Sequence, residues 1–312
     1  MKKHTLPSVV NSISELLRIF ELPKPHHPQI CLLQHAGIPP IPKDLWKGSI
    51  VNFYVISAKK DFKGKMRYGK NYYDFDEGTL TFVAPGQVIA TEDEGETDCN
   101  GWTLFFHPDL IRNYPLGKKI KDYGFFSYAV NEALHLSEQE EAILESLLSN
   151  IELEYNTSID LFSQDVLVSH LDLLLNYANR FYHRQFLTRK TAHSDLLTKL
   201  EDLLESYFSS DQPGKIGLPS VAYLSEQLNV SSNYLSDMLR TLTGLNTQQH
   251  IHHKLIEKAK DALSSTSLTV NEIAYGLGFE HPQSFSKLFK SKMNVTPLKF
   301  RSSIQRPQKT FE

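Results

Sequence analysis

The period of the hydrophobic positions changes along this chain, and the changes predict different structure in successive regions. Apolar residues within 8–20 recur at helical spacing and predict a short helix, and the proline-rich stretch 22–28 predicts an extended connector after it. From about 29 to 107 the apolar residues come in short runs separated by turn residues, as in β-strands. These runs are Ile30 to Leu33, Ile50 to Ile56, Met66 to Phe75, Thr79 to Val83 and Trp102 to Phe106.

The short runs predict a small antiparallel barrel or jelly roll, a cupin-like architecture. Asp76-Glu77-Gly78 and Pro85-Gly86 supply turn signals between the runs. The many aromatic residues of this region supply the volume that fills such a barrel, and core packing is the first interpretation of each of them.

Helical periodicity returns at Ser137, which predicts an N-cap with Glu140 at the third helical position. The stretch 137–186 predicts a hairpin of two helices with one apolar face on the barrel. Surplus apolar surface on this pair predicts a dimer seam, and packing within the chain is the equal alternative. The polar segment 187–192 predicts an interdomain linker, and the pattern after it is helical.

We therefore expect an α+β protein with an N-terminal helix and arm (1–28), a cupin-like barrel with a helical pair (29–190) and an all-α domain (194–305). The net charge of −3 conceals opposite signs in the two parts. Residues 1–217 carry a net charge of −7 and residues 218–312 a net charge of +4. A small basic domain beside an acidic one is the pattern expected when one domain binds a polyanion.

The last ninety residues contain a weak internal repeat at an offset of 49 to 50 residues. The stretch 221–230 (VAYLSEQLNV) aligns with 270–279 (VNEIAYGLGF), so that Ser225 matches Ala274 and Asn229 matches Gly278. After one extra residue in the second copy, the apolar positions of the next helix also coincide.

Each copy has the pattern of a helix-turn-helix, at about 219–244 and 268–294. A small residue in the first helix permits close approach of the second, and Asn229 or Gly278 suits the left-handed backbone of a sharp turn. Pro282 fits the first turn of its helix, with His281 as the cap. The stretch 247–263 predicts a linker helix about 25 Å long. Two such units on a rigid helix can enter successive major grooves about 34 Å apart.

The stretch 270–301 (VNEIAYGLGFEHPQSFSKLFKSKMNVTPLKFR), with IEKAKDAL before it, resembles the AraC/XylS family of bacterial transcription regulators. The elements I-A-x-x-x-G-F, S-F-S-K-x-F-K and T-P-x-x-F-R occur together at the family spacing, and the match covers roughly 194–303. The resemblance implies a cytoplasmic, sequence-specific DNA-binding regulator that is not an enzyme. It also implies RNA polymerase as a partner and a small-molecule effector in a dimerising N-terminal barrel. Activation and repression both stay open.

The polar face of each second helix is expected to read DNA. In the second copy Gln283, Ser284 and Lys287 are the predicted base-reading residues, because Gln pairs with adenine and Lys with guanine. The predicted phosphate contacts are Arg240, Lys290, Lys292, Lys299 and Arg301.

In the first copy the corresponding base-reading positions are Ser232, Asn233, Ser236 and Asp237. Asp237 departs from the family pattern, because a carboxylate accepts from cytosine but is repelled by phosphates. Two interpretations of Asp237 stay open: it reads bases weakly, or it pairs with a neighbouring cation and positions the helix.

The aromatic residues Phe53, Tyr72, Phe82 and Trp102 are candidates to line the effector pocket that the resemblance implies. A DNA-binding protein whose barrel only dimerises is one alternative, and a cupin-type enzyme is another.

No cofactor and no metal site is expected. No histidine lies between His35 and His107, where the strands of a metal-binding barrel would need ligands. The cluster His250 to His253 has no acidic or thiol ligand near it in sequence, and is interpreted as a solvated helix face. Cys31 and Cys99 alone build neither a four-thiolate zinc site nor a disulfide framework, which together with the absence of a secretory signal favours the cytoplasm.

Overall fold

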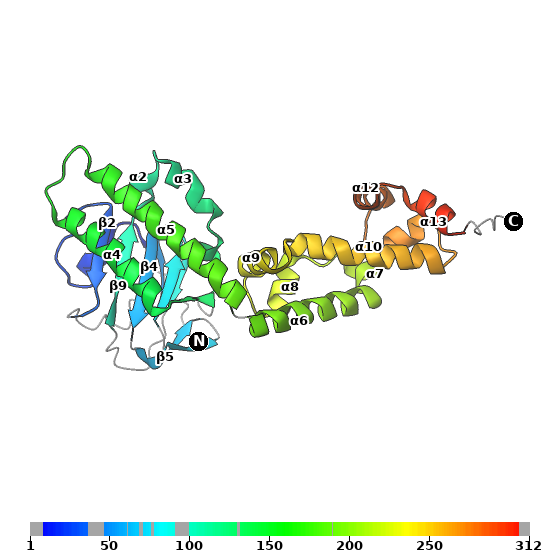
Figure 1. The fold of residues 1–312 in the computed structure, drawn as a ribbon, viewed down its shortest axis with the longest axis horizontal. Coiled ribbons are helices and arrows are strands. Elements are labelled where there is room, and N and C mark those ends of the chain that lie inside the picture. Colours follow the sequence, from blue (N-terminus) through cyan, green and yellow to red (C-terminus); the bar gives the residue numbers. More distant parts are fainter. Residues whose placement is uncertain are drawn as a thin grey trace, which may run out of the picture. The chain divides into compact units, whose positions relative to one another are not determined.

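The computed structural model describes residues 9–36, 47–60, 62–68, 71–75, 78–90, 100–129, 132–188 and 190–305. The chain divides into two compact units, residues 1–188 and residues 189–312, and each is described by itself. Strands occur in the first unit, whereas the described residues of the second unit form helices and their connections (Figure 1). The mixed α+β class is therefore confirmed.

The first unit is built on a five-stranded sheet with the strand order β10-β7-β4-β9-β2. Every neighbouring pair in this sheet is antiparallel. The central strand β4 pairs with β9 from Tyr54 opposite Phe106 to Lys60 opposite Asn100. The strands are β2 (Ile30–Gln34), β4 (Tyr54–Lys60), β7 (Thr79–Val83), β9 (Asn100–Phe106) and β10 (Leu134–His135).

A three-stranded sheet β1-β3-β8 and a hairpin β5-β6 complete the strands of this unit. Among the described strands no sheet closes on itself, so the closed jelly roll stays a prediction. The apolar run from Ile50 to Ile56, predicted as one strand, contains the end of β3, a bend and the start of β4. The strands are β1 (Val9–Val10), β3 (Lys47–Val51), β5 (Phe62–Tyr68), β6 (Asn71–Phe75) and β8 (Val88–Ala90).

The two faces of the five-stranded sheet are covered by different elements because side chains alternate along a strand. On one face the buried side chains include Ile56, Leu80 and Leu104, and α4 (Glu138–Asn156) and α5 (Ser163–Thr188) cover this face (Figure 1). The other face contributes Cys31, Val55 and Phe105 to a core shared with α1 (Ile13–Ile19) and β1. Short helical segments connect β9 to β10: α2 (Pro108–Ile111), α3 (Pro115–Lys119), η1 (Ile120–Asp122) and η2 (Gly124–Ser127).

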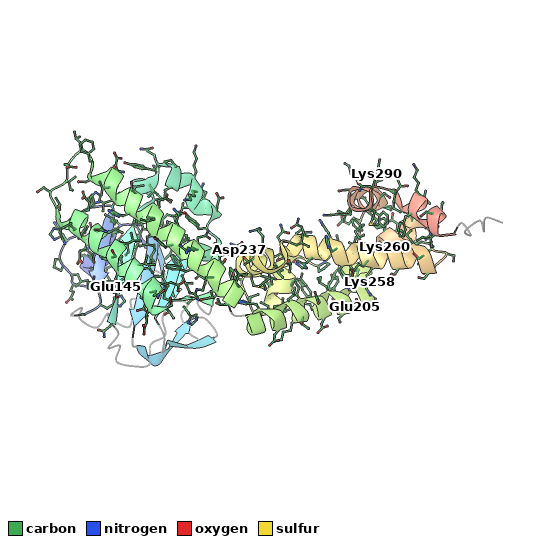
Figure 2. All side chains as sticks on the ribbon, in the orientation of Figure 1. Glu145, Glu205, Asp237, Lys258, Lys260 and Lys290 are labelled. Atoms are coloured by element: carbon green, nitrogen blue, oxygen red, sulfur yellow. The ribbon has the colours of Figure 1, made fainter. Side chains whose placement is uncertain are left out.

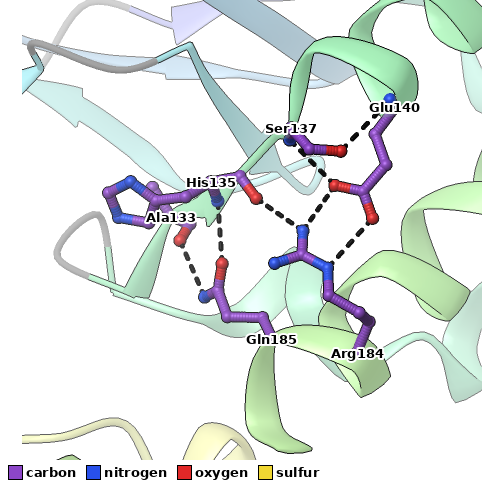
Figure 3. A network of polar contacts seen from close by, with 6 residues as sticks. All are labelled: Ala133, His135, Ser137, Glu140, Arg184 and Gln185. Carbon is purple, nitrogen blue, oxygen red and sulfur yellow. Dashed lines mark hydrogen bonds and ion pairs between the residues drawn. The ribbon is translucent and has the colours of Figure 1, made fainter. Parts of the chain in front are cut away.

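A polar network joins the start of α4 to the end of α5 (Figure 3). The predicted capping box is confirmed, because Ser137 Oγ accepts from the Glu140 amide and the Glu140 carboxylate accepts from the Ser137 amide. The same carboxylate accepts from Arg184 Nε at 2.9 Å, and Arg184 Nη2 donates to the His135 carbonyl at 2.8 Å. Gln185 bonds the backbone of both Ala133 and His135, so the last turns of α5 are tied to β10.

The polar segment 187–192, predicted as a linker, is helical on both sides of residue 189. Helix α5 continues to Thr188 and α6 begins at Lys190. The segment lacks apolar periodicity but contains no proline or glycine to break a helix. The helices of the second unit are α6 (Lys190–Ser209), α7 (Gln212–Ile216), α8 (Val221–Gln227), α9 (Ser232–Thr243), α10 (Thr247–Ser265), α11 (Val270–Gly276), α12 (Pro282–Met293) and α13 (Pro297–Gln305).

Helix α10 is the axis of the second unit, and its buried stripe of Ile251, Leu255, Ala259 and Leu263 contacts helices on several sides. At one end Leu235 and Met238 of α9 are fully buried, and at the other end Phe285 and Phe289 of α12 are. Within the described part of the chain, none of the helices combines the length and the apolar character needed to cross a membrane.

Candidate nucleic-acid interface

The two predicted helix-turn-helix units have the same backbone at their turns. Asn229 has φ +56° and Gly278 has φ +92°, so both adopt the predicted left-handed conformation. The Val230 amide donates to the Ser225 carbonyl, and the Phe279 amide donates to the Ala274 carbonyl, each at 3.0 Å. This shared hydrogen-bond pattern sets α8 against α9 and α11 against α12 in the same way.

Local sequence explains where these helices begin. Ser220, Ser231 and Thr269 cap α8, α9 and α11 through their side-chain oxygens, and Thr269 forms a capping box with Glu272. His281 occupies the N-cap position of α12 as predicted, but its side chain makes no capping hydrogen bond. Pro282 at the first helical position fixes the backbone there instead.

Helix α12 presents the predicted second-unit residues to solvent. Gln283, Ser284 and Lys287 are all exposed, and so are Lys290 and Lys292 (Figure 2 labels Lys290). The apolar side of α12 is anchored by Phe285 and Phe289, which continue an aromatic chain from Phe279 to Phe300. The reading face is thus held by a packed core directly behind it.

A groove on this face contains groups from three elements. Lys287 and Lys290 line it from α12, Asn271 from the first turn of α11, and Thr296 from the start of α13. Two ammonium groups beside a carboxamide and a hydroxyl form a surface that suits a phosphate backbone. Asn271 and Thr296 were not among the predicted site residues, because a helix-face argument selects residues on one helix and cannot bring in neighbouring elements.

Helix α9 presents fewer free polar groups than α12. Ser232 Oγ is 2.8 Å from Ser225 Oγ, and Ser236 Oγ is 2.9 Å from Thr247 Oγ1 at the start of α10. Both of these predicted base-reading hydroxyls therefore join helices of the unit to one another. Asn233 is exposed. The first helix-turn-helix unit consequently exposes fewer of its predicted base-reading groups than the second helix-turn-helix unit.

Asp237 pairs with Arg240 one turn later on the same helix. Arg240 Nη1 donates to Asp237 Oδ1 at 2.9 Å, and the Arg240 side chain is 58% exposed. This is the second of the two interpretations that the sequence left open for Asp237. A carboxylate in this position neutralises part of the charge of Arg240 and limits its rotamers.

The two predicted phosphate contacts on α13 lie in different environments. Lys299 is exposed, whereas Arg301 is partly buried and its Nε donates to the Leu263 carbonyl of α10 at 3.1 Å. Arg301 Nη2 is buried and has no partner among the described residues. Arg301 therefore ties α13 to the end of α10 in this structure.

The histidines of α10 contact neighbouring polar side chains. Burial lowers the pKa of both His250 and His252, and the charge of His253 lowers both further. The charge of Lys292 also lowers the pKa of His252, whereas that of Glu201 raises the pKa of His250. His250 Nε2 is 2.9 Å from Thr243 Oγ1. No group of three or more His, Cys, Asp or Glu side chains in the described residues has the arrangement needed to hold a metal ion.

Three of the predicted effector-pocket residues, Phe53, Phe82 and Trp102, are buried in the core of residues 1–188. Phe53 is fully buried in the core with α1, at 5.9 Å between ring centroids from Phe105. Phe82 packs on the helix-covered face of the sheet against Phe125 and Phe126, and Trp102 is buried on that same face. The side chain of Tyr72 lies outside the described residues.

A polar cluster lies instead on the opposite face of the sheet. His35 Nε2 is 2.8 Å from Thr103 Oγ1, which is 2.9 Å from Ser57 Oγ. Burial and the charge of Lys59 lower the pKa of His35 to about 4, so the imidazole is neutral at pH 7. Gly101 allows this arrangement, because a Cβ there would lie 2.2 Å from the Ala58 carbonyl oxygen and 3.1 Å from His35 Nδ1.

Comparison with known proteins locates a family domain in the second unit. The family model described as "Helix-turn-helix domain" matches residues 224–303. An uncharacterized HTH-type transcriptional regulator of Staphylococcus aureus (strain MRSA252) is 25% identical over 242 residues, which cover 71% of this chain and 31% of that protein. The chain therefore spans about a third of the length of the curated relatives that it matches first.

Further similarities cover shorter parts of the chain. The Msm operon regulatory protein of Streptococcus mutans is 32% identical over 82 residues, covering 26% of this chain and 30% of that protein. Among solved structures, the C-terminal domain of the response regulator yesN from Fusobacterium nucleatum is 32% identical, with a TM-score of 0.31, and the match covers 34% of this chain and 98% of that one. The DNA-binding domain of AdpA, solved with a target DNA, is 21% identical with a TM-score of 0.30, and the match covers 35% of this chain and 96% of that one.

Proposed function

We propose that this chain, which carries an AraC-type helix-turn-helix domain, is a sequence-specific DNA-binding transcriptional regulator. One observation carries the proposal: two helix-turn-helix units lie in one compact unit on a single connecting helix, each with a polar face on its second helix. Helix α10 has 19 residues and is therefore about 28 Å long, which suits two readers in successive major grooves.

In this proposal the second helix-turn-helix unit makes most of the contacts that recognise the DNA sequence. Gln283, Ser284 and Lys287 read base edges, and Lys290, Lys292 and Lys299 contact phosphates. Asn271 and Thr296 join the phosphate-binding surface because they line the same groove as Lys287 and Lys290. Arg301 supports α13 from within and is not assigned to a phosphate.

The first helix-turn-helix unit contributes fewer DNA contacts. Asn233 reads a base edge and Arg240 contacts a phosphate, with Asp237 as a positioning residue that orients Arg240. Ser232 and Ser236 hold α9 in place through their hydroxyl partners. Asymmetric reading of this kind predicts that one half of the recognised DNA site is more strictly specified than the other.

We further propose that a small polar effector binds to the N-terminal part of the chain, residues 1–188, beside His35, Ser57 and Thr103. Hydroxyls and a neutral imidazole on one sheet face suit a ligand that carries hydroxyl or carboxylate groups. The aromatic candidates support packing instead, because they lie on both sides of the sheet. A barrel that only dimerises is the alternative, and a thermal-shift screen of the full chain against sugars and organic acids separates the two.

The same proposal includes a homodimer formed through α5 and, at promoters, contact with RNA polymerase. The exposed large apolar residues within α5 are Val166, Leu173 and Leu187, and Leu161 and Phe162 are exposed directly before it. Phe162, Val166, Leu173 and Leu187 lie on one line of exposed positions that repeats every seven residues, which is the seam spacing of paired helices.

Selection of bound sequences from random duplex DNA by the full chain tests the central proposal. We expect enrichment of a bipartite motif and an affinity that falls with salt, with a slope of about −0.9 per neutralised phosphate. Equal binding to selected and shuffled duplexes would remove the proposal of a sequence-specific regulator. A salt-independent complex would show that phosphates are not the partner.

A further inference from the structure

The segment that precedes the first helix-turn-helix unit lies against the turn of the second. Gly217 ends α7 with φ +89°, and its carbonyl accepts a hydrogen bond from Tyr207 Oη at 2.9 Å. Gly217 also lies against Gly278, the turn residue between α11 and α12. Only three residues further on, Ser220 caps α8. The two helix-turn-helix units are therefore connected twice, by helix α10 and by the segment 213–217.

This contact leaves no room for a side chain at residue 278. A Cβ on Gly278 would lie 2.7 Å from the Gly217 carbonyl carbon and 2.9 Å from the Pro213 carbonyl oxygen. Both neighbours are backbone atoms, which cannot rotate away as the end of a side chain can. A residue larger than glycine would have to separate the turn from 213–217, and we call this close approach the spacer contact.

The turn of the first helix-turn-helix unit shows that such a turn can form without glycine. Asn229 occupies the matching position, carries a side chain and adopts φ +56°. Its amide donates to Glu226 as the Gly278 amide donates to Tyr275, at 3.1 and 3.0 Å. Asparagine is one of the few residues that tolerate this conformation. The spacer contact is therefore a separate reason for glycine at 278.

Helix α6 supports the same connection along its length. Glu205 pairs with Lys254 Nζ at 2.8 Å and with Lys258, both on α10; Figure 2 labels Glu205 and Lys258. Tyr207 packs edge-on against Tyr223 of α8, and His193 Nε2 is 3.1 Å from Tyr234 Oη of α9. Helix α6 thus contacts α10 and the first helix-turn-helix unit, and the segment 213–217 contacts the second helix-turn-helix unit.

We propose that the spacer contact of Pro213 and Gly217 with Gly278 sets the separation of α9 and α12, and so selects the spacing between the two half-sites on DNA. This inference rests on the proposed function. The three residues are positioning residues, since their backbones face each other. One base pair advances the helix axis by about 3.4 Å, so a displacement of about 2 Å or more between the two helix-turn-helix units, which exceeds half a step, alters which spacing fits best.

The test is selection from random duplex DNA with full-length Gly278→Asn, beside the wild type and Asn229→Gly. Gly278→Asn places at 278 the residue that the other turn already accepts, and Asn229→Gly makes the converse change at the matching turn. We expect the wild type and Asn229→Gly to enrich one spacing. For Gly278→Asn we expect the same half-sites at a broadened or shifted spacing, and about tenfold weaker binding to the wild-type site.

Tyr207→Phe is the second variant, because it removes the hydroxyl that holds Gly217 and leaves the ring in place. It is used if Gly278→Asn fails to give a cooperative thermal transition with wild-type helical content. A folded variant that still selects only the wild-type spacing overturns the spacer proposal. A wild type that selects no sequence at all overturns the proposed function instead, so the two failures are distinguishable.

Discussion

Lys287 and Lys290 lie on the same exposed face of α12, yet we expect different effects from removing each of them. In the proposed function Lys287 reads base edges with Gln283 and Ser284, so Lys287→Ala is expected to weaken binding to the selected site by about 1–3 kcal/mol and to relax the preference at one base pair. Lys290→Ala is expected to weaken all sequences alike and to reduce the salt slope by about 1.

Quantitative binding to duplexes that vary one base pair at a time measures both effects. Lys199→Ala is the matched control, since Lys199 is an exposed lysine of α6 outside the groove. An unchanged sequence preference in Lys287→Ala would contradict its assignment to base reading.

Arg301 gives a prediction in which stability and DNA binding separate. Arg301→Gln loses the charged hydrogen bond to the Leu263 carbonyl, and we expect the free energy of unfolding to fall by about 1–3 kcal/mol. The salt slope of DNA binding should not change. Chemical denaturation and salt titration of the same sample check this, and a slope reduced by about one with wild-type stability would return Arg301 to the phosphate contacts.

These residues show where inference from sequence stops at this scale. The repeat identified α9 and α12 and their polar faces, because helical period alone determines which positions share a face. It could not show that Ser236 meets Thr247 or that Arg301 reaches Leu263, since these partners come from other helices. Asp237 and Arg240 lie three residues apart on one helix, so the helical period allows them to pair, and the distance of 2.9 Å shows that they do.

At the scale of elements, caps and periodicity located most helices and strands. The capping box at Ser137 and the left-handed turns at Asn229 and Gly278 were predictable, because each depends on a few adjacent residues. The segment 187–192 was predicted as an interdomain linker, and the chain divides into its two compact units between residues 188 and 189. Its helical structure was not predicted, because a short polar segment without proline or glycine does not show whether it is helical. Closure of the barrel depends on pairing between distant strands, which single-sequence patterns do not specify.

The capping box of α11 yields a prediction at this scale. Thr269→Ala removes the oxygen that accepts from the Glu272 amide, and we expect a loss of about 1 kcal/mol in the free energy of unfolding. Thr269→Ser retains that oxygen and is the control. If thermal unfolding of Thr269→Ala matched that of the serine variant, the cap would contribute nothing to the second unit.

At the scale of the whole molecule, His35 predicts how stability depends on pH. Its pKa is about 4 in the folded chain and near 6.5 when unfolded, so the unfolded state takes up the proton first. This stability is complete above pH 6.5 and is lost as the pH falls toward 4. Between pH 7 and pH 4 the free energy of unfolding should fall by about 2 kcal/mol more for the wild type than for His35→Gln, after allowing for partial solvent screening. Chemical denaturation at each pH measures this fall. Equal pH profiles would contradict the burial of a neutral His35.

The exposed line on α5 leads to a prediction about assembly. Acidic Asp165 lies near the start of the helix and basic Arg180 in its second half, with Leu173 between them. Two copies paired antiparallel place Asp165 of each opposite Arg180 of the other and bring the two Leu173 side chains together at the axis. In this arrangement Asp165, which also accepts a hydrogen bond from Tyr114 Oη at 2.5 Å, meets a charge of opposite sign from the second copy.

Charge exchange distinguishes this arrangement from general stickiness of an apolar face. Asp165→Arg and Arg180→Asp should each weaken the dimer by about 1 kcal/mol, whereas the double variant should recover most of the loss, because it restores opposite charges at both contacts. Leu173→Asp should weaken the dimer more strongly than either, since it places two carboxylates at the axis. Sedimentation equilibrium of the full chain measures these constants. A double variant as weak as the sum of its two singles would rule out the antiparallel pairing, and a monomeric wild type would rule out the dimer.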